Sequence, residues 1–107
     1  MRQHCFALLI LATPVVAEDL DPAILEIEGD PEYGEYLSSE CVTCHRLDGE
    51  TEGIPSIVYF ETEDFVILMH AYKSGEREHQ VMQTITKRLG NEEIAALAAY
   101  FSSLNTE

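Results

Sequence analysis

The sequence is poor in basic residues. Its 107 residues include 6 Lys and Arg against 20 Asp and Glu, a formal net charge of −14 at pH 7. Nucleic-acid binding depends on cations that neutralise phosphates, so a nucleic-acid partner is excluded. An acidic surface favours redox partners with a basic docking surface, because it speeds their association in a way that weakens as salt rises. The alternative is that the charge serves solubility alone.

Cysteine is also scarce, with three residues, and this limits the thiol and metal chemistry. A structural zinc site needs about four ligands, usually as two Cys or His pairs. Cys41 and Cys44 form one such pair, but there is no second Cys pair and no His-x3-5-His spacing. A thioredoxin-like motif would need a βαβ context, which the chain does not offer. No arrangement of nucleophile, base and oxyanion donors is present, so we do not expect an enzyme.

No apolar run at the N-terminus is long enough to span a bilayer. The run at residues 5–12 is too short. It follows the basic head Met1-Arg2-Gln3-His4 and precedes Val15-Val16-Ala17, a pattern typical of a secretory signal peptide. We predict cleavage after Ala17, which discards Cys5, exports the protein to the periplasm and leaves no transmembrane anchor. The alternative is an uncleaved buried helix.

The predicted mature chain is small and more acidic still. Removing residues 1–17 leaves 90 of the 107 residues, with five basic against twenty acidic residues and a net charge of −15. We divide it into an acidic N-terminal leader, residues 18–29, and one domain, residues 30–107. The leader either packs across the domain or extends away from it. A domain of this size has a marginal core by itself.

The most informative stretch is Cys41-Val42-Thr43-Cys44-His45. Two thiols three positions apart, with an imidazole directly after the second, can form thioether bonds to a haem edge while the imidazole meets the iron. We predict one haem c per chain, attached through Cys41 and Cys44, with His45 as a ligand of the iron. Export supports this, because bacteria complete such proteins outside the cytoplasm. The haem would supply apolar surface for the small core, so we expect the haem-free chain to be poorly ordered.

Capping patterns predict helices near both ends of the domain. Asp30 as N-cap before Pro31 begins a helix that we extend to about residues 41–45. Asn91 as N-cap begins the last helix, which runs to Leu104 with apolar residues at intervals of three and four. Gly34 inside the first helix costs about 1 kcal/mol relative to Ala, which indicates close approach by another backbone or ring. We expect the Ala-rich last helix there, with Tyr100 or Leu97 over Gly34.

A further helix is predicted between these two. Thr62 is its expected N-cap, and it ends near Ser74 with Gly75 as the stop. Met69 lies on its apolar stripe and is interpreted as a core or haem-wall side chain. His70 lies off the stripe, and we expect it to be solvated.

The motifs as an ordered set resemble the class I cytochromes c over residues 30–104. Within that class, the chain is similar to one half of the dihaem periplasmic cytochromes and to the haem subunit of flavocytochrome c sulfide dehydrogenase. The resemblance implies an all-α fold with crossed N- and C-terminal helices around a haem crevice. The residues that carry it are Gly34-Glu35-Tyr36-Leu37, Cys41-x-x-Cys44-His45, Gly53-Ile54-Pro55-Ser56-Ile57, Tyr72-Lys73-Ser74-Gly75-Glu76-Arg77, Met82, Leu89-Gly90-Asn91-Glu92-Glu93-Ile94 and Leu97-Ala98-Ala99-Tyr100.

The resemblance also implies roles for two further residues. Pro55 would offer its carbonyl to His45 and so orient the imidazole, whereas without the resemblance it is a turn proline. Met82 would be the second ligand of the iron, and a thioether there raises the reduction potential. His79, Met69 and an open position are the alternatives.

Two functions are compatible with these features. The first is a monohaem c-type cytochrome that transfers single electrons in the bacterial periplasm as a diffusible carrier. The alternative is a haem-bearing subunit of a flavoprotein dehydrogenase that oxidises sulfide or another sulfur compound, in which this chain relays electrons without being catalytic. A gas sensor or peroxidase would need an open iron position, and Met82 argues against that.

Overall fold

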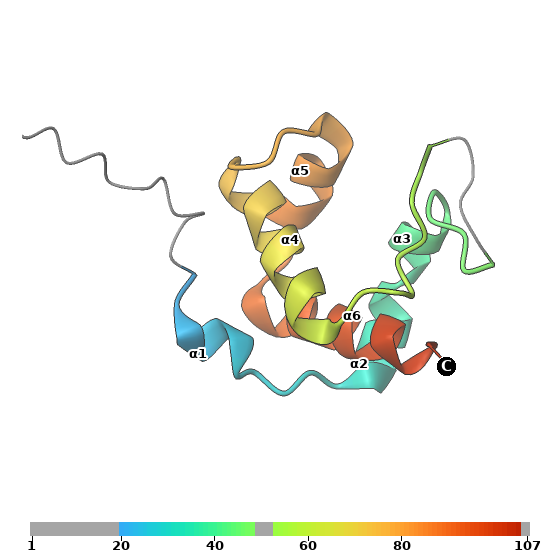
Figure 1. The fold of residues 1–107 in the computed structure, drawn as a ribbon, viewed down its shortest axis with the longest axis horizontal. Coiled ribbons are helices and arrows are strands. Elements are labelled where there is room, and N and C mark those ends of the chain that lie inside the picture. Colours follow the sequence, from blue (N-terminus) through green and yellow to red (C-terminus); the bar gives the residue numbers. More distant parts are fainter. Residues whose placement is uncertain (1–19, 49–52, 106–107) are drawn as a thin grey trace, which may run out of the picture.

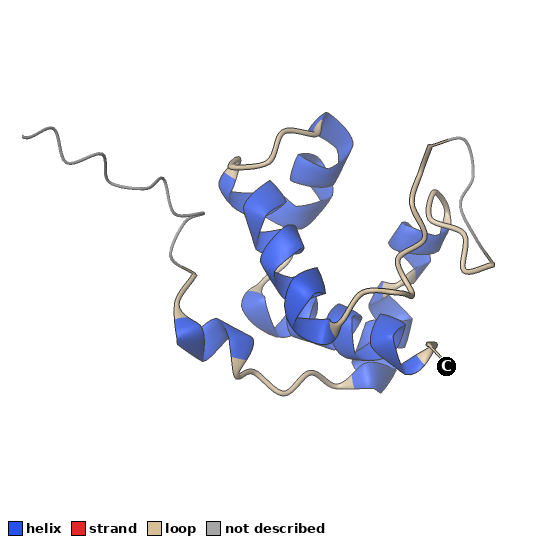
Figure 2. Ribbon diagram, viewed as in Figure 1, coloured by secondary structure: helices blue, strands red, loops and turns tan. Residues whose placement is uncertain are grey.

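The computed structural model describes residues 20–48 and 53–105, which form helices and loops with no strand among them (Figure 1, Figure 2). The predicted all-α class is confirmed, while the predicted signal peptide lies outside the described residues. No described helix combines the length and hydrophobicity that a membrane span requires. In chain order the helices are α1 (Pro22–Leu25), α2 (Pro31–Leu37), α3 (Ser39–Val42), α4 (Thr62–Ser74), α5 (Gln80–Lys87) and α6 (Asn91–Ser103).

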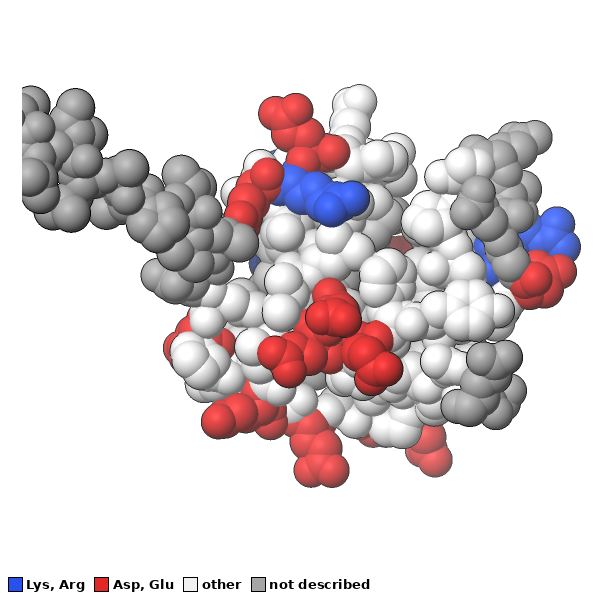
Figure 3. Space-filling view, in the orientation of Figure 1, with Lys and Arg blue, Asp and Glu red and all other residues white. Residues whose placement is uncertain are grey.

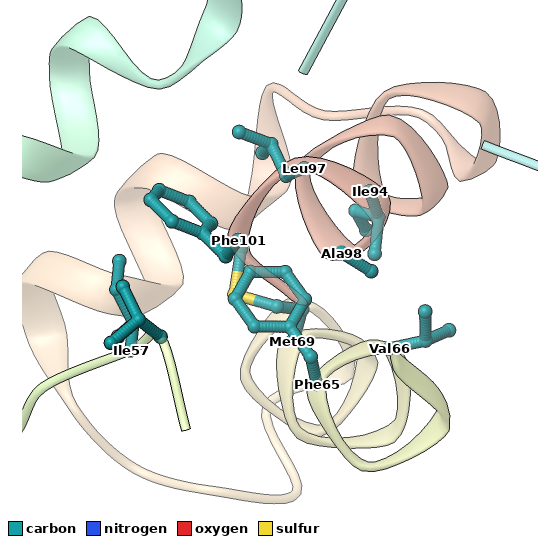
Figure 4. Packing of buried hydrophobic residues seen from close by; sticks show 9 residues of the cluster. Ile57, Phe65, Val66, Met69, Ile94, Leu97, Ala98 and Phe101 are labelled. Carbon is teal, nitrogen blue, oxygen red and sulfur yellow. The ribbon is translucent and has the colours of Figure 1, made fainter. Parts of the chain in front are cut away.

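Helices α2 and α6 pack on each other through a glycine, as the sequence predicted. A Cβ placed on Gly34 would lie 2.0 Å from the carbonyl oxygen of Ala96 and 2.7 Å from the Cβ of Tyr100. Tyr100 is therefore confirmed as a neighbour, and Leu97 is a buried member of the hydrophobic core (Figure 4). The closest neighbour is the backbone of Ala96. Only a residue without a side chain fits this contact.

The described part of the leader, residues 20–29, packs across the domain instead of extending from it. Its described part contains α1, which begins where the side chain of Asp21 accepts the Ala23 N–H at 3.0 Å. The apolar side chains of Leu20 and Ile24 pack against the core. A Cβ on Gly29 would lie 2.0 Å from a backbone oxygen of α6, so the leader also runs close to that helix.

The core lies between α4, α6 and the loop that precedes α4 (Figure 4). Helix α6 is buried along much of its length because its small residues let neighbouring segments approach. The rings of Phe65 and Phe101 meet with centroids 5.8 Å apart. The most buried apolar residues are Phe65, Val66 and Met69 of α4, Ile94, Ala95, Ala96, Leu97, Ala98 and Phe101 of α6, and Ile57 and Val58 of the loop.

The first predicted helix is interrupted, which corrects the expectation of a continuous helix to residues 41–45. Asp30 does cap α2, accepting the Glu32 N–H at 3.0 Å. The break falls at Ser38, whose hydroxyl donates to the Glu35 carbonyl at 2.6 Å. A serine hydroxyl competes with the backbone for such carbonyls, so α2 ends and α3 restarts one residue later.

Two predicted N-caps are wrong by one residue. Helix α6 is capped at Gly90, whose N–H donates to the side chain of Glu93 at 3.0 Å, so Asn91 is the first helical residue. A glutamate three residues after the cap favours this arrangement. Thr62 likewise opens α4 as its first helical residue, and its hydroxyl donates to Ser102 at 3.1 Å.

The predicted end of α4 is confirmed, whereas the predicted solvent exposure of His70 is not. Gly75 has φ 84°, the left-handed conformation that ends helices. His70 is partly buried, and its Nε2 has no hydrogen-bond partner. The expectation that it is solvated is therefore wrong. Burial, followed by the nearby Lys73, lowers the pKa of His70 and keeps the ring neutral.

Candidate functional site

A single cavity brings together the residues selected from the sequence. It lies between α3 with its following loop on one side and α4 and α5 on the other (Figure 1). Its volume is about 510 Å³, within the usual range for small-molecule and cofactor sites. Most of its walls are apolar or aromatic. It is lined by all seven candidates: Cys41, Cys44, His45, Pro55, Met69, His79 and Met82.

The Cys-x-x-Cys-His stretch forms a tight turn at the end of α3. The Cys41 carbonyl accepts the N–H of Cys44 at 3.2 Å and the N–H of His45 at 2.8 Å. These two bonds close the backbone on itself, so both thiols and the imidazole line the same cavity. Both cysteines are free thiols.

His45 makes one hydrogen bond that fixes its chemistry. Its Nδ1 lies 2.8 Å from the carbonyl oxygen of Pro55. A carbonyl oxygen can only accept, so Nδ1 carries the hydrogen and the Nε2 of the neutral ring keeps its lone pair. The imidazole is therefore held in the form that binds a metal through Nε2.

The environment of Cys41 opposes the other uses of a Cys-x-x-Cys pair. Burial, followed by the charge of Glu40, raises the pKa of Cys41 to about 11. A nucleophilic or redox thiol needs the opposite shift. Nor do three His, Cys, Asp or Glu side chains converge as a metal site anywhere in residues 20–48 and 53–105. The raised pKa of Cys41 therefore disfavours a redox role for this pair.

The opposite wall carries α5, a helix that the sequence analysis did not identify. Its N-cap is His79, whose Nδ1 accepts the N–H of Met82 at 3.3 Å. The buried hydroxyl of Thr86 donates to the Met82 carbonyl at 2.8 Å. The backbone of Met82 is thus held from both directions while its half-buried side chain lines the cavity. A histidine in place of the usual Ser, Thr, Asp or Asn hid this N-cap.

The structure adds a pair of residues to which the sequence assigned no role. The Arg77 Nε–H donates to the Tyr72 hydroxyl at 3.0 Å, and the guanidinium carbon lies 5.5 Å from the centre of the Tyr72 ring. Both residues line the cavity. The sequence signal for both residues was their place in the motif Tyr72-Lys73-Ser74-Gly75-Glu76-Arg77, which carries part of the resemblance.

Most of the charged surface on the face shown in Figure 3 is acidic. Acidic residues are spread over the face shown, whereas basic residues occupy a few places. Two basic residues of the described chain have acidic partners, with Arg46 2.9 Å from Asp48 and Arg88 3.4 Å from Glu40. These exposed pairs contribute at most about 1 kcal/mol each to stability.

Known proteins similar to this chain agree with the site. The family model for cytochrome c matches residues 32–105. The cytochrome subunit of sulfide dehydrogenase of Chlorobaculum tepidum is 32% identical over 73 residues, which cover 67% of this chain and 66% of that protein. Cytochrome c-554(548) of Halomonas halodenitrificans is 31% identical over 80 residues, which cover 70% of this chain and 96% of that protein.

The residues present fit the haem c that this family binds. The cavity offers two free thiols and an imidazole with an available lone pair on one wall, and a thioether on the other. Apolar side chains between them suit a porphyrin plane. The chain therefore belongs to the cytochrome c family, whose members bind haem c covalently through Cys-x-x-Cys-His and serve in electron transfer.

Proposed function

We propose that this chain is a monohaem c-type cytochrome that carries single electrons in the bacterial periplasm. Cys41 and Cys44 would hold the haem through thioether bonds, and His45 and Met82 would bind the iron from its two sides. The observation that carries the proposal is that these four side chains, from α3 with its following turn and from α5, line one cavity. When bound, the haem supplies reversible one-electron oxidation and reduction.

On the proximal side, Pro55 has the role of orienting His45. Its carbonyl accepts the Nδ1–H at 2.8 Å, which fixes the ring and makes Nε2 more basic. Proline suits this position because its lack of an N–H leaves only an acceptor. The bond also keeps a neutral His45 in the tautomer needed for iron binding.

On the distal side, two observations favour Met82 over its alternatives. The Met69 side chain is 5% exposed and packs within the hydrophobic core, so drawing it to the iron would open that core (Figure 4). The Nδ1 of His79 accepts the Met82 N–H, so the neutral His79 ring carries its hydrogen on Nε2 and has no free lone pair there. Met82 is half-buried and lines the cavity, and its side chain is neither part of the tightly packed core nor engaged in a helix cap.

The apolar lining gives the site its second property. Side chains such as Ile57, Phe65 and Leu68 cover the cavity and would exclude water from the iron. Low polarity disfavours the extra positive charge of the oxidised state and so supports a raised potential. The proposed role of the site is electron transfer.

We propose a diffusible carrier with transient partners as the first form of this role. Redox encounters use small interfaces, and an acidic surface accelerates association with basic partners. The alternative is a haem-bearing subunit fixed to a flavoprotein dehydrogenase that oxidises sulfide or another sulfur compound. The 32% identity to a cytochrome subunit of sulfide dehydrogenase favours testing that form.

The test is expression of the full chain in a bacterium that matures c-type cytochromes. We expect a red exported protein whose colour survives acid–acetone extraction, and whose N-terminal residue is Glu18. A Cys41→Ala, Cys44→Ala variant is the matched control and should lose its colour on extraction. A colourless wild-type product would refute the proposal.

Gel filtration of the protein from its native source separates the two forms. A carrier elutes at the size of one small chain with haem absorbance only. A subunit elutes at a larger size together with flavin absorbance. Elution with flavin would overturn the carrier form and support the alternative.

A further inference from the structure

Helix α2 carries two tyrosines that the fold leaves exposed. Tyr33 is 41% exposed and Tyr36 is 79% exposed. The helix turns its buried residue, Gly34, toward α6, so Tyr36 lies on the opposite side of the helix and Tyr33 at the edge of the contact. Neither tyrosine lines the cavity, and Figure 1 shows α2 at the bottom of the molecule and α5 at the top. This face is therefore separate from the proposed haem site.

The two rings are held in a fixed arrangement. They are stacked, with centroids 6.5 Å apart and an angle of 16° between their planes. The Tyr33 hydroxyl donates to Oε2 of Glu93 at 3.4 Å, and Oε1 of the same carboxylate accepts the Gly90 N–H that caps α6. A carboxylate fixed by a helix cap thus anchors Tyr33, whose ring lies against that of Tyr36. Rigid tyrosine rings offer contact area to a partner at a low cost in conformational entropy.

Negative charge lies beside these tyrosines. Glu32 and Glu35 of α2 are exposed, and neither has an ion-pair partner among the described residues. Glu32 precedes Tyr36 by four positions, the spacing at which side chains on a helix meet. In the part of the chain that the structure describes, the cation placed over a tyrosine ring is Arg77, at Tyr72 in the cavity. The exposed ring of Tyr36 and two carboxylates are therefore available to a cation from outside.

The charge of the chain decides among the possible occupants of this face. A second copy carries the same net charge of −14, and nucleic acids and anionic lipid surfaces also repel acidic residues. A guanidinium, in contrast, forms forked hydrogen bonds with carboxylates and stacks on aromatic rings. Carboxylates and exposed tyrosine rings on one helix face match this side chain.

We propose that the α2 face, formed by Glu32, Tyr33, Glu35 and Tyr36, binds an arginine-bearing basic segment of a partner protein. A guanidinium of that segment lies on the ring of Tyr36 and pairs with Glu32 or Glu35. Because the cavity lies elsewhere on the molecule, a partner bound here leaves the proposed haem site open to a second protein. The surface is thus additional to the proposed electron-transfer site.

The test titrates the reduced, isotope-labelled holoprotein with a peptide of alternating arginine and glycine and follows the amide signals by NMR. At about 0.15 M salt, attraction beyond about 8 Å is screened, so general attraction to an acidic protein contributes little. We expect the largest shifts at the α2 face. The peptide should also bind more tightly than the same peptide with lysine in place of arginine, because a guanidinium stacks on a ring.

Two exposed tyrosines give a matched pair of variants. Tyr36→Ser removes the ring from the α2 face and should weaken binding of the arginine peptide about two- to fivefold, the effect of one exposed cation–π contact. Tyr59→Ser is the control, because its ring is 69% exposed in the loop before α4. This variant should bind the peptide as wild type does.

A second pair of variants tests the carboxylates. Glu32→Gln combined with Glu35→Gln should weaken binding more than Glu63→Gln combined with Asp64→Asn. The control pair removes two exposed charges at the start of α4, so the change in net charge is the same.

Equal affinities of Tyr36→Ser and Tyr59→Ser, or an arginine peptide that binds no more tightly than the lysine peptide, would overturn the inference. Largest shifts at the cavity residues of α5 would also overturn it, because the peptide would then bind at the proposed haem site. Signals of the α2 face that shift with protein concentration before peptide is added would place a second copy there instead. Each of these results would leave the haem assignment intact.

Discussion

Two histidines at the same cavity are held in opposite tautomers by one hydrogen bond each. His45 places Nδ1 against an acceptor, the Pro55 carbonyl at 2.8 Å, and so keeps a lone pair on Nε2. His79 places Nδ1 against a donor, the Met82 N–H at 3.3 Å, and so carries its hydrogen on Nε2. Residue type alone makes both histidines candidate ligands. The hydrogen-bond partner of Nδ1 therefore distinguishes the proposed ligand, His45, from the helix cap, His79.

At this scale, the two internal methionines give a direct test of the distal ligand. Met82→Ala should abolish the sulfur-to-iron charge-transfer band of the oxidised protein and lower the midpoint potential, because the thioether favours ferrous iron. Absorption spectroscopy and redox titration measure both effects.

The matched control for this test is Met69→Leu. Leucine preserves most of the volume of a core methionine and should cost less than about 1.5 kcal/mol of stability. The band should survive in this variant. A band that persists in Met82→Ala and disappears in Met69→Leu would reverse the ligand assignment.

At the scale of elements, the contact between α2 and α6 depends on a missing side chain. Helix propensity by itself favours replacing Gly34, since Ala is better by about 1 kcal/mol in a helix. The packing opposes this, because a Cβ there would lie 2.0 Å from the Ala96 carbonyl oxygen. The two clashing atoms are the added Cβ and a backbone oxygen, and neither can move by a side-chain rotation. One helix would therefore have to shift to remove the clash.

Gly34→Ala should therefore destabilise the holoprotein by about 1 to 3 kcal/mol, the usual cost of overpacking. Chemical denaturation followed by circular dichroism measures the free energy of unfolding. Glu35→Ala is the control on the same helix, exposed and expected to change stability by no more than about 0.5 kcal/mol. A Gly34→Ala protein as stable as wild type would mean that the helices do not approach this closely.

The helix boundaries show which local sequence signals were sufficient to predict where a helix begins or ends. Asp30-Pro31 and Gly75 were predicted because each end uses a residue type with a strong positional preference. The start of α6 was misplaced because Gly90 serves as N-cap through its backbone and the side chain of Glu93. The start of α5 was missed because its cap is a histidine.

At the scale of the whole molecule, the hydrophobic core and the cavity are one continuous region. Ile57, Phe65 and Met69 belong to the core and also line the cavity of about 510 Å³. An empty cavity of this size forfeits packing contacts on one side of those residues. We therefore expect the fold to depend on the haem that fills this cavity.

We expect the haem-free chain to lack a cooperative thermal transition. The form to examine is the Cys41→Ala, Cys44→Ala variant made without export, with mature holoprotein as the reference. Circular dichroism should show a broad, low-temperature loss of helix in the variant and a sharp transition in the holoprotein. A sharp transition at the holoprotein temperature in the variant would contradict this.

A second prediction at this scale concerns the effect of the surface charge on the rate of electron transfer. With a net charge of −14, electron transfer to a cationic redox complex should slow as ionic strength rises from about 0.01 to 0.5 M, because screening shortens the range of the attraction. Transfer to an anionic complex should accelerate over the same range. Stopped-flow rates that do not change with ionic strength for either complex would show that the charge serves solubility only.

Local chemistry was enough to determine the cofactor and the class of fold. The spacing of Cys41, Cys44 and His45 is specific because each atom must reach one haem, and capping residues and 3–4 periodicity are encoded within a few residues. These features do not depend on distant parts of the chain.

Only the tertiary structure decided which side chains meet across the chain. The bond from His45 to Pro55 spans ten residues, and the contact of Gly34 with Ala96 joins the two ends of the domain. Likewise, His70 proved partly buried and the leader proved packed, because burial is set by neighbours that are remote in sequence. Periodicity determines one face of a helix, while the segment that covers that face follows from the packing of the whole chain.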